Sequence, residues 1–435
     1  MKTRFEDFNI HNVKIKMEKR SIKELIIVSL LVIALFSCKK NDDSGEPALT
    51  PTITAISPIT AAYNTLLTIT GTNFSTTPTE NKVTINDIEV TVQSCTNTTL
   101  TILVPSLTEG SFPIKVTTKN GNCSSNLSFT YQYTIYAAGY ESDGNKYVGK
   151  IWKNGIATSI NDASTINALT VLGSDIYVAG NEWKSPNSNS YIAKYWKNGV
   201  AVSLTNGNNI AEALALLVVE NDVYIAGYDG NVATYWKNGV LTSLTNGYSY
   251  SKATGIGKNG NDIYVTGYDG KVAKYWKNGV AADLTDGTSP SAQAQSITVS
   301  GNNIYIAGYE WDGPYGNAFI AKYWKNGVAI PLTDGNEDNY AYGVVVIGSD
   351  VYVAGDGSNG TSKAKYWKNG METSLTNGLN DAAAFCIAAI GTDVYIGGFE
   401  TIRNNIRVAK YWKNGVATAV SDGKYEAVIH AICIK

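Results

Sequence analysis

The stretch that decides the fold of most of this chain is DIYVTGYDGKVAKYWKNG, residues 262–279. Residues 262–268 and 271–276 are short runs rich in β-branched and aromatic residues, which is typical of strands. The Asn-Gly pair at 278–279 precedes another such run, and it predicts a tight hairpin because both turn residues need positive φ. The stretch therefore predicts consecutive antiparallel strands joined by short turns.

The same unit recurs along residues 133–435. Its tryptophan, in Tyr-Trp-Lys-Asn-Gly or once Ile-Trp-Lys-Asn-Gly, stands at Trp152, Trp196, Trp236, Trp276, Trp324, Trp367 and Trp412. Successive copies are 44, 40, 40, 48, 43 and 45 residues apart, which is close to the period of a four-stranded propeller blade, about 40–45 residues. We expect these tryptophans to pack between blades rather than to bind ligand, because blades with minimal loops carry them too.

The array begins and ends out of phase with its own repeat. Residues 135–139 match the second strand of a unit, and residues 429–434 match the first strand. Pairing of these two segments would complete one blade and leave no exposed sheet edge. We therefore predict a closed seven-bladed β-propeller, which resembles Kelch-type propellers without their full paired-glycine signature.

Residues 51–132 predict a β-sandwich, because runs such as 66–70 and 100–104 alternate with a period of two. A characteristic order of residues runs through Ile53, Ile56, Pro58, Ile69, Gly71, Asn73, Phe74, Leu100, Val104, Pro105, Gly110, Ile114 and Val116. This order resembles the IPT/TIG family of immunoglobulin-like domains, and it departs from that family at residues 62–64, where a turn glycine is usual. The resemblance implies a spacer or protein-contact module. The expected fold class is thus all-β, an immunoglobulin-like sandwich followed by the propeller.

The N-terminal segment has the order of a lipoprotein leader. Basic residues follow Met17, which we take as the true start, and an apolar run over 25–36 is short of a membrane span. The run ends in Leu35-Phe36-Ser37-Cys38, which resembles a lipobox and implies a lipid on Cys38. The expected segments are a signal peptide over 1–37, a lipidated flexible tether over 38–50, the sandwich over 51–132 and the propeller over 133–435.

The net charge of the chain limits the classes of partner that we expect. Removal of residues 1–37 takes seven basic and four acidic residues from totals of 35 and 37, so the mature chain carries about −5. A negative chain is a poor nucleic-acid binder, so no nucleic acid is expected. Contact with a membrane is expected through the lipid anchor alone. Acidic residues soon after Cys38 resemble surface-export tags, which favours the outer membrane facing the cell exterior over its periplasmic face.

No motif of catalysis stands out. His430 is the single histidine after the leader and lies in an apolar strand, which argues against Ser-His-Asp and Cys-His machinery and His-ligated zinc. Residues 255–260 match G-x-G-x-x-G but lead into a strand, and residues 334–338 lack the spacing of a calcium loop. We expect no catalytic residues, metal or cofactor. A carboxylate pair for glycoside hydrolysis remains open, because spatial separation is invisible in a sequence.

The sequence predicts different roles for the four cysteines that follow the tether. Cys95 and Cys123 fall in one exported domain and are candidates for a disulfide. Cys386 and Cys433 lie within apolar strands and are expected to be buried small residues.

Strand direction predicts where a ligand binds. In each blade the loops between the second and third strands and between blades emerge on one face, and these loops vary in length, as binding loops do. Two of them carry Trp183 and Trp311, which with Tyr315 are candidate platforms for sugar rings. Acidic loop residues, among them Glu141, Glu182 and Glu310, should make this face negative, and the lysines of the Lys-Asn-Gly turns should make the other face a basic ring.

These features together predict a non-enzymatic surface lipoprotein that acts as a binding or adhesion module. An extracellular glycan is the first candidate ligand. The alternatives are an adhesin that binds a surface protein and a polysaccharide-degrading enzyme built on the propeller.

Overall fold

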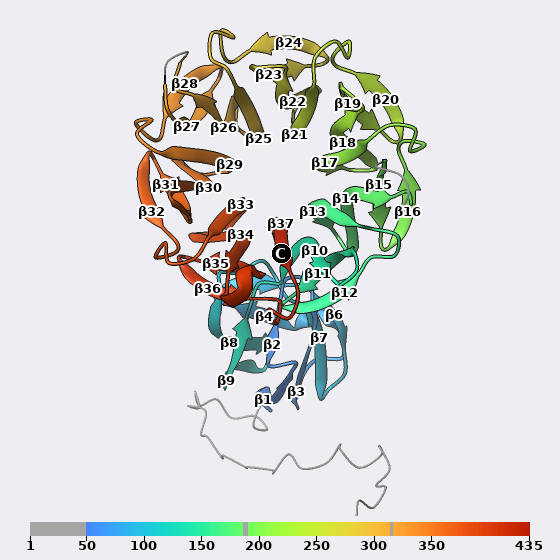
Figure 1. The fold of residues 1–435 in the computed structure, drawn as a ribbon. Helices are drawn as coiled ribbons and strands as arrows, with labels where there is room; N and C mark the ends of the chain where they lie inside the picture. Colours follow the sequence, from blue (N-terminus) through green and yellow to red (C-terminus); the bar gives the residue numbers. More distant parts are fainter. Residues whose placement is uncertain (1–48, 186–189, 314–315) are drawn as a thin grey trace, which may run out of the picture.

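The computed structural model describes residues 49–185, 190–313 and 316–435, and over these residues the chain is built from strands (Figure 1). Two short 3-10 turns, η1 (Pro78–Glu80) and η2 (Arg403–Asn405), interrupt them. Within the described ranges, no helix is long and apolar enough to cross a membrane. The predicted all-β fold class, an immunoglobulin-like sandwich followed by a seven-bladed propeller, is confirmed.

The N-terminal unit is a sandwich of two sheets. One sheet has the order β1 (Thr52–Ser57), β3 (Leu66–Thr72), β7 (Thr99–Leu103), β6 (Val92–Cys95). The other has the order β2 (Thr60–Ala61), β9 (Gly121–Tyr131), β8 (Gly110–Thr118), β4 (Lys82–Ile85), β5 (Ile88–Val90). Alternate residues such as Leu67, Ile69, Val83 and Ile85 point inward and are fully buried, as a period of two requires.

Cys95 and Cys123 are not joined in the structure, so the expected disulfide is not formed. Cys95 lies in β6, at one edge of its sheet. Cys123 lies in β9, which packs against β1 at the opposite edge of that same sheet. The two strands therefore stand at opposite sides of the sandwich.

The second unit is a ring of seven four-stranded antiparallel sheets, or blades (Figure 1). We name the strands of each blade A to D, from the central axis outward, and number the blades 1 to 7 along the chain. The A strands are β37 (Ala427–Ile434), β13 (Thr165–Leu172), β17 (Ala211–Val219), β21 (Ser251–Asn259), β25 (Ala292–Ser300), β29 (Asp338–Ile347) and β33 (Ala382–Ile390). The B strands are β10 (Ile135–Ser142), β14 (Asp175–Trp183), β18 (Asp222–Asp229), β22 (Asp262–Asp269), β26 (Asn303–Trp311), β30 (Asp350–Asn359) and β34 (Asp393–Thr401).

The outer half of each blade completes the sheet. The C strands are β11 (Tyr147–Lys153), β15 (Tyr191–Lys197), β19 (Val232–Lys237), β23 (Val272–Lys277), β27 (Phe319–Lys325), β31 (Thr361–Lys368) and β35 (Arg407–Lys413). The D strands are β12 (Ile156–Ser159), β16 (Val200–Ser203), β20 (Val240–Ser243), β24 (Val280–Asp283), β28 (Val328–Pro331), β32 (Met371–Ser374) and β36 (Val416–Ala419). We call the side with the B–C and D–A loops the loop face, and the side with the A–B and C–D turns the turn face.

Blade 1 closes the ring in the predicted way. Strand β37, at the C-terminus, pairs antiparallel with β10, and its register runs from Ile135 opposite Ile434 to Glu141 opposite Ala427. The C-terminus consequently lies beside the first propeller strand in Figure 1. The pairing removes the free edge that either strand would otherwise expose.

The sandwich is joined to the turn face of blade 7. The hydrophobic cluster of the sandwich continues into Tyr395 and Ile432 of the propeller. Glu109 of the sandwich accepts a hydrogen bond from the backbone N–H of Tyr133 and contacts Lys413, at the end of β35. The loop face therefore lies on the side of the ring away from the sandwich.

Candidate functional site

The repeated tryptophans are part of the architecture. All seven are fully buried, and each packs against the preceding blade: Trp236 of blade 3 lies among Tyr177 and Ala179 of blade 2. Trp324 of blade 5 donates its indole N–H to the carbonyl of Leu284, which follows the last strand of blade 4. The predicted packing between blades is confirmed, so these residues are not available to a ligand.

The Lys-Asn-Gly turns are architectural as well. Asn278 and Gly279 both have positive φ, at 50° and 84°, as the hairpin prediction requires. Asn278 accepts a hydrogen bond from the N–H of Ile263 and donates one to Asp262, at the start of the B strand. The same aspartate pairs with Lys277 at 2.7 Å.

The prediction that these lysines make the turn face a basic ring is therefore wrong. Five of the seven turn lysines pair with the aspartate that opens their own B strand: Lys197–Asp175, Lys237–Asp222, Lys277–Asp262, Lys368–Asp350 and Lys413–Asp393. Lysine and aspartate lie far apart in sequence but adjacent in the folded hairpin, and their charges offset one another.

The expected negative charge of the loop face is reduced in the same way. Glu141, Glu182 and Glu310 each pair with a lysine of the neighbouring C strand, Lys150, Lys194 and Lys322 respectively. These glutamates are half-buried. Three of the acids expected to make the loop face negative are thus neutralised.

The blades differ in the residue that each carries at a β-bulge in the A strand. Every A strand has one extra residue at the same register with its B strand, between residues such as Ala213 and Ala215 in blade 3. We call these seven extra residues the bulge ring: His430, Asn167, Leu214, Thr254, Gln295, Tyr342 and Phe385, in blade order from 1 to 7. Bulges turn a side chain away from the regular pleat and are frequent next to functional sites.

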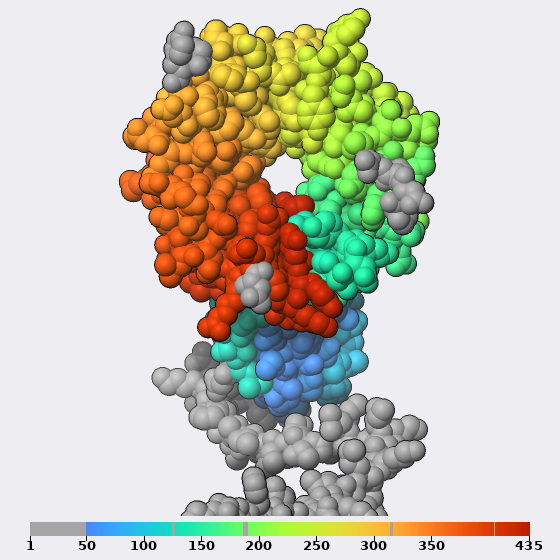
Figure 2. All heavy atoms as spheres, viewed as in Figure 1, coloured from blue at the N-terminus to red at the C-terminus, as the bar shows by residue number. Residues whose placement is uncertain are grey.

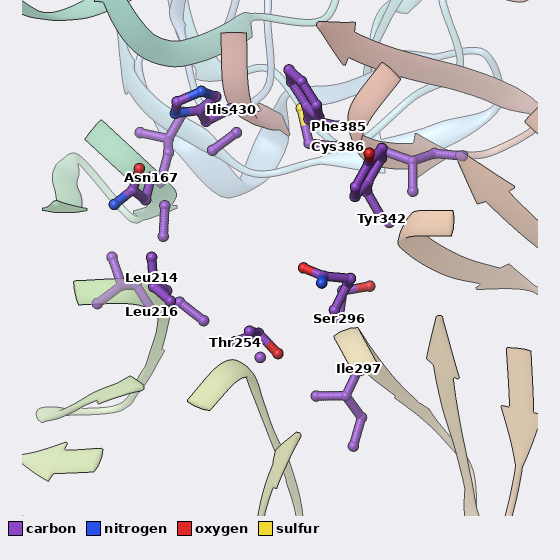
Figure 3. A pocket seen from close by; sticks show the side chains of 18 of the residues that line it. Asn167, Leu214, Leu216, Thr254, Ser296, Ile297, Tyr342, Phe385, Cys386 and His430 are labelled. Atoms are coloured by element: carbon purple, nitrogen blue, oxygen red, sulfur yellow. The ribbon is translucent and has the colours of Figure 1, made fainter. Parts of the chain in front are cut away.

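The bulge ring lines the central channel of the propeller. All seven residues border one cavity of about 540 Å³, and all are half-buried. Figure 2 shows the opening at the centre of the ring, and Figure 3 shows side chains from A strands on all sides facing it. The volume lies within the range of about 300–1,000 Å³ that is typical of small-molecule sites.

The next level of the channel is chemically uniform. Two residues beyond each bulge, farther from the loop face, stands an aliphatic side chain, and we call these seven the aliphatic collar: Leu169, Leu216, Ile256, Ile297, Val344, Ile387 and Ile432. The residues immediately before the bulges, such as Ala213 and Ala253, are fully buried. The bulge ring is therefore a varied layer of the channel wall that stands directly above an aliphatic layer.

Part of the bulge ring holds its neighbours in place. Asn167 donates a hydrogen bond to the carbonyl of Ala213 at 3.0 Å, and Thr254 donates one to the carbonyl of Ala294 at 2.7 Å. Both acceptors occupy the position just before the bulge of the next blade. Burial lowers the pKa of His430 to about 4, although a hydrogen bond with the backbone of Ile166 opposes this shift, so the ring is uncharged near neutral pH.

Three neighbouring members of the ring are aromatic and start a longer surface. The Tyr342 and Phe385 rings are 5.3 Å apart, and the Phe385 and His430 rings are 5.8 Å apart. From this centre, edge and tilted contacts continue outward in blades 5 to 7 and 1. We call the whole set the aromatic arc: Trp311, Phe319, Tyr309, Tyr340, Tyr342, Phe385, Phe399, His430, Tyr140 and Tyr147.

Blade 6 places a carboxylate within the arc. Asp356 stands on β30 where blades 1, 3, 4 and 5 have tyrosine, and it accepts a hydrogen bond from Ser362 Oγ at 2.5 Å. Burial raises the pKa of Asp356 to about 6, even though hydrogen bonds from Ser362 and Tyr342 lower it. Burial also raises the pKa of Tyr342.

The opposite wall, in blades 3 and 4, is aromatic and charged. The Tyr250 ring lies 6.2 Å from that of Tyr228 and 6.3 Å from that of Tyr268. The ammonium of Lys252 sits 4.4 Å from the centre of the Tyr228 ring. Glu212 adds a half-buried carboxylate that hydrogen-bonds Tyr228.

The predicted sugar platforms have different surroundings. Trp311 packs edge-on against Phe319 of its own hairpin, 4.9 Å between ring centres, and so forms the outer end of the arc. Trp183 is 40% exposed at the equivalent place in blade 2, opposite Tyr191, and its backbone N–H donates a hydrogen bond to Ser164 Oγ. Tyr315 and Cys38 lie outside the described residues.

The remaining sequence candidates have structural explanations. Residues 255–259 lie in strand β21 and Gly260 in the turn that follows, as expected. Burial raises the pKa of the Cys386 thiol, which borders the channel, to about 12. Over the described part of the chain, no group of three or more His, Cys, Asp and Glu residues is placed to hold a metal ion.

Sequence reasoning overlooked the bulge ring, although a signal was present. When the seven A strands are aligned, this position holds seven different residue types, as does the position two residues earlier, while the residues directly before and after the bulge remain small or aliphatic. A level of the channel at which the blades vary in this way is a candidate for recognition.

The described residues thus define an all-β protein in which an immunoglobulin-like sandwich adjoins a closed seven-bladed propeller. Residues 51–131 match the IPT/TIG domain family, which confirms the resemblance of the sandwich to that family. No curated protein matches the chain.

Several solved structures are similar over most of the chain. A protein of unknown function from Bacteroides thetaiotaomicron is 12% identical, covers 81% of this chain and 96% of its own, and has a TM-score of 0.42. An auxiliary nutrient binding protein from the same species is 14% identical, covers 85% and 99%, and has a TM-score of 0.35. The β-propeller domain of the Trilobed protease from Pyrococcus furiosus is 9% identical, covers 86% and 96%, and has a TM-score of 0.42.

Proposed function

We propose that this chain is a non-enzymatic binding protein whose loop face binds an extracellular glycan. The observation that carries the proposal is the aromatic arc, which runs without a break from Trp311 to Tyr147 around one side of the channel mouth. Aromatic faces pack against the C–H faces of sugar rings, and tyrosine hydroxyls supply hydrogen bonds at the same place. Gln293 accepts a hydrogen bond from Tyr309 of the arc, and Glu212 adds a half-buried carboxylate on the opposite wall of the mouth.

Display of this face fits the order of the chain. The sandwich joins the turn face of blade 7, so the loop face lies on the side of the propeller away from the sandwich, which Cys38 precedes in the sequence. A lipid on Cys38 and the tether over 38–50 would hold the protein at the outer membrane, with the loop face directed outward. This placement is part of the proposal.

Two alternatives each have one observation in their favour. Exposed apolar side chains on D–A loops, Tyr248 at 91% and Leu379 at 80%, favour a protein partner, as for an adhesin. The raised pKa of Asp356 is a property of a general acid, which favours a polysaccharide-degrading enzyme. A glycan-degrading enzyme would also hold sugars on an aromatic surface, so the arc does not separate it from a binding protein, and the cleavage assay below does.

The test uses the soluble chain from residue 51 onward. Linear neutral hexasaccharides of gluco-, manno-, xylo- and galacto- type are titrated by calorimetry, and the same mixtures are followed by chromatography for cleavage. We expect binding of at least one hexasaccharide without cleavage, and at least tenfold weaker binding for Tyr340→Ala, whose ring is central to the arc.

The matched control is Tyr63→Ala, which removes a half-exposed tyrosine from the sandwich and should bind like wild type. Trp183→Ala, Trp311→Ala and Tyr315→Ala test the sugar platforms expected from the sequence. Absence of binding to all four hexasaccharides, or release of shorter sugars from them, would contradict the proposal.

A further inference from the structure

We propose that the propeller recognises the end of a glycan chain, an uncharged terminal sugar that enters the channel along its axis and is read by the bulge ring. This inference rests on the proposed function and deepens it, because it states which part of a glycan is bound.

The closed topology of the propeller limits access to the bulge ring. The pairing of β37 with β10 closes the propeller, so the channel has no lateral opening between blades. A side chain at the bulge level, such as Leu214, can be reached only from a mouth of the channel (Figure 3). The interior of a long chain can lie across the loop face, but only an end can reach the ring.

The residues at each level of the channel limit how deeply a sugar can enter. The bulge ring lies below the loop face and above the aliphatic collar, which offers no hydrogen-bonding side chain at any of its seven positions. A sugar hydroxyl at the collar would lose water without gaining a partner, which is costly. The terminal sugar therefore stops above the collar, at the bulge ring, where side chains such as Asn167, Gln295 and Tyr342 carry hydrogen-bonding groups.

The bulge ring combines aromatic, aliphatic and polar side chains. Tyr342 and Phe385 form an aromatic side in blades 6 and 7, with their rings in edge contact at an interplanar angle of 67°, and Leu214 and Thr254 stand across the ring in blades 3 and 4. Gln295 lies between these two sides, and its amide group donates to Gln293 and Tyr309 at 3.0 and 3.4 Å. The bulge ring therefore has an aromatic side, a side of smaller residues and a carboxamide between them. These suit a single sugar, whose face packs against the aromatic side and whose edge hydrogen-bonds to the carboxamide.

The charge of the bulge ring bears on the kind of sugar that it can hold. None of the seven bulge residues is acidic, lysine or arginine, and His430 is neutral near pH 7 because burial opposes its charged form. A carboxylate at the chain end would be desolvated there without a counter-charge on the ring. The structure thus favours neutral terminal sugars over uronic acids.

The experiment measures stoichiometry against chain length, which needs no variant. The soluble chain from residue 51 onward is titrated with a series of linear neutral oligosaccharides of three to ten residues and with the matching long polymer, using the type that binds in the hexasaccharide screen. End recognition predicts one protein per chain at every length. A number of bound proteins that rises with chain length would overturn the inference and leave the proposed function intact.

A pair of variants tests the position of the site. Leu214→Trp adds bulk inside the ring, whereas Leu241→Trp makes the same change on β20, at the outer perimeter of the same blade, where Leu241 is 45% exposed. We expect at least tenfold weaker binding for the first and unchanged binding for the second, with unchanged thermal transitions in both. If Leu214→Trp fails to fold, Gln295→Ala removes a polar ring member without adding bulk and should also weaken binding.

The outcomes separate the two proposals. Binding that is weakened by Tyr340→Ala but not by Leu214→Trp or Gln295→Ala would place the glycan on the loop face alone and overturn the inference. Oligosaccharides that end in a uronic acid should bind at least tenfold more weakly than their neutral counterparts, and equal binding would also count against it. Failure of every oligosaccharide to bind wild type contradicts the proposed function itself.

Discussion

Tyr342 and Phe385 are the bulged residues of two neighbouring A strands, and their rings meet at the channel wall with centres 5.3 Å apart. They are brought together because the same bulge recurs at the same register in successive blades. The repeated residues around them hold the blades together, whereas the side chains at the bulges differ from blade to blade. Several consequences can be measured.

The buried and exposed tryptophans should differ sharply in their effect on stability. Trp236→Ala removes a fully buried ring between blades 2 and 3 and should lower the free energy of unfolding by about 3–5 kcal/mol. Trp183→Ala, at a 40% exposed position, serves as the matched control and should cost roughly 1 kcal/mol or less. Chemical denaturation followed by far-UV circular dichroism measures both. Equal losses would contradict the assignment of the repeat tryptophan to interblade packing.

Asp356 should make stability depend on pH. Burial raises its pKa from 3.8 to about 6, so the folded state binds this proton more tightly than the unfolded state, and the carboxylate becomes destabilising as pH rises through that window. Asp356→Asn should therefore match wild type near pH 4 and exceed its stability near pH 7.5 by on the order of 2 kcal/mol. Thermal unfolding of both proteins across this range gives the difference. A difference that does not change with pH would refute the shifted carboxyl.

His430 requires a matched comparison in that experiment. Burial lowers its pKa from 6.5 to about 4, so its contribution to stability is present at high pH and is lost as pH falls through this range. The effect has the opposite sign to that of Asp356 and is common to both proteins. The difference between variant and wild type, rather than the profile of either one, isolates Asp356.

The C-terminal strand should be essential for the propeller. Deletion of residues 428–435 removes most of β37 and leaves β10 of blade 1 with an unpaired edge. We expect loss of the cooperative thermal transition, or oligomers that pair the free edge with another chain. Size-exclusion chromatography with light scattering and calorimetry detect these two results. A monomer with an unchanged transition would show that closure does not hold the ring together.

The ion pair between the two units should have a small, local effect. Glu109→Ala removes the contacts with Lys413 and with the Tyr133 N–H, and because both side chains are partly exposed the loss should be about 1 kcal/mol. Glu89→Ala breaks a more exposed sandwich pair with Lys82 and should cost less. Limited proteolysis across residues 131–135 reports loosening of the joint, and cleavage at the same rate in both variants would argue against coupling through Glu109.

Cys38 should decide where the protein is found. Cys38→Ala removes the expected lipid attachment and should shift the protein from the membrane to the soluble fraction after cell lysis, because stable anchoring needs two or more acyl chains. An unprocessed leader could hold the variant at the membrane, so its N-terminus is determined by mass spectrometry as a control. Extraction of wild type by alkaline carbonate would be incompatible with a lipid anchor.

The sequence by itself determined the repeat, the strands of each blade and the way the ring closes. These features depend on local chemistry: Asn278 and Gly279 adopt positive φ within a few bonds, and residues 262–268 have the composition of a strand. Closure followed from the phase of residues 135–139 and 429–434, since a free strand edge is unfavourable whatever the details of packing.

Only the tertiary structure decided where the candidate site lies. A bulge is a shift in register between two strands, so nothing in the residues next to Tyr342 or Phe385 marks them as extra until their B strands are in place. The charge of each face likewise depended on pairs across strands, such as Lys322 with Glu310. Trp183 and Trp311 look equivalent in sequence, but Phe319 covers one edge of Trp311, whereas Trp183 faces Tyr191 and is 40% exposed. Such differences arise from contacts between distant residues, which a local pattern cannot specify.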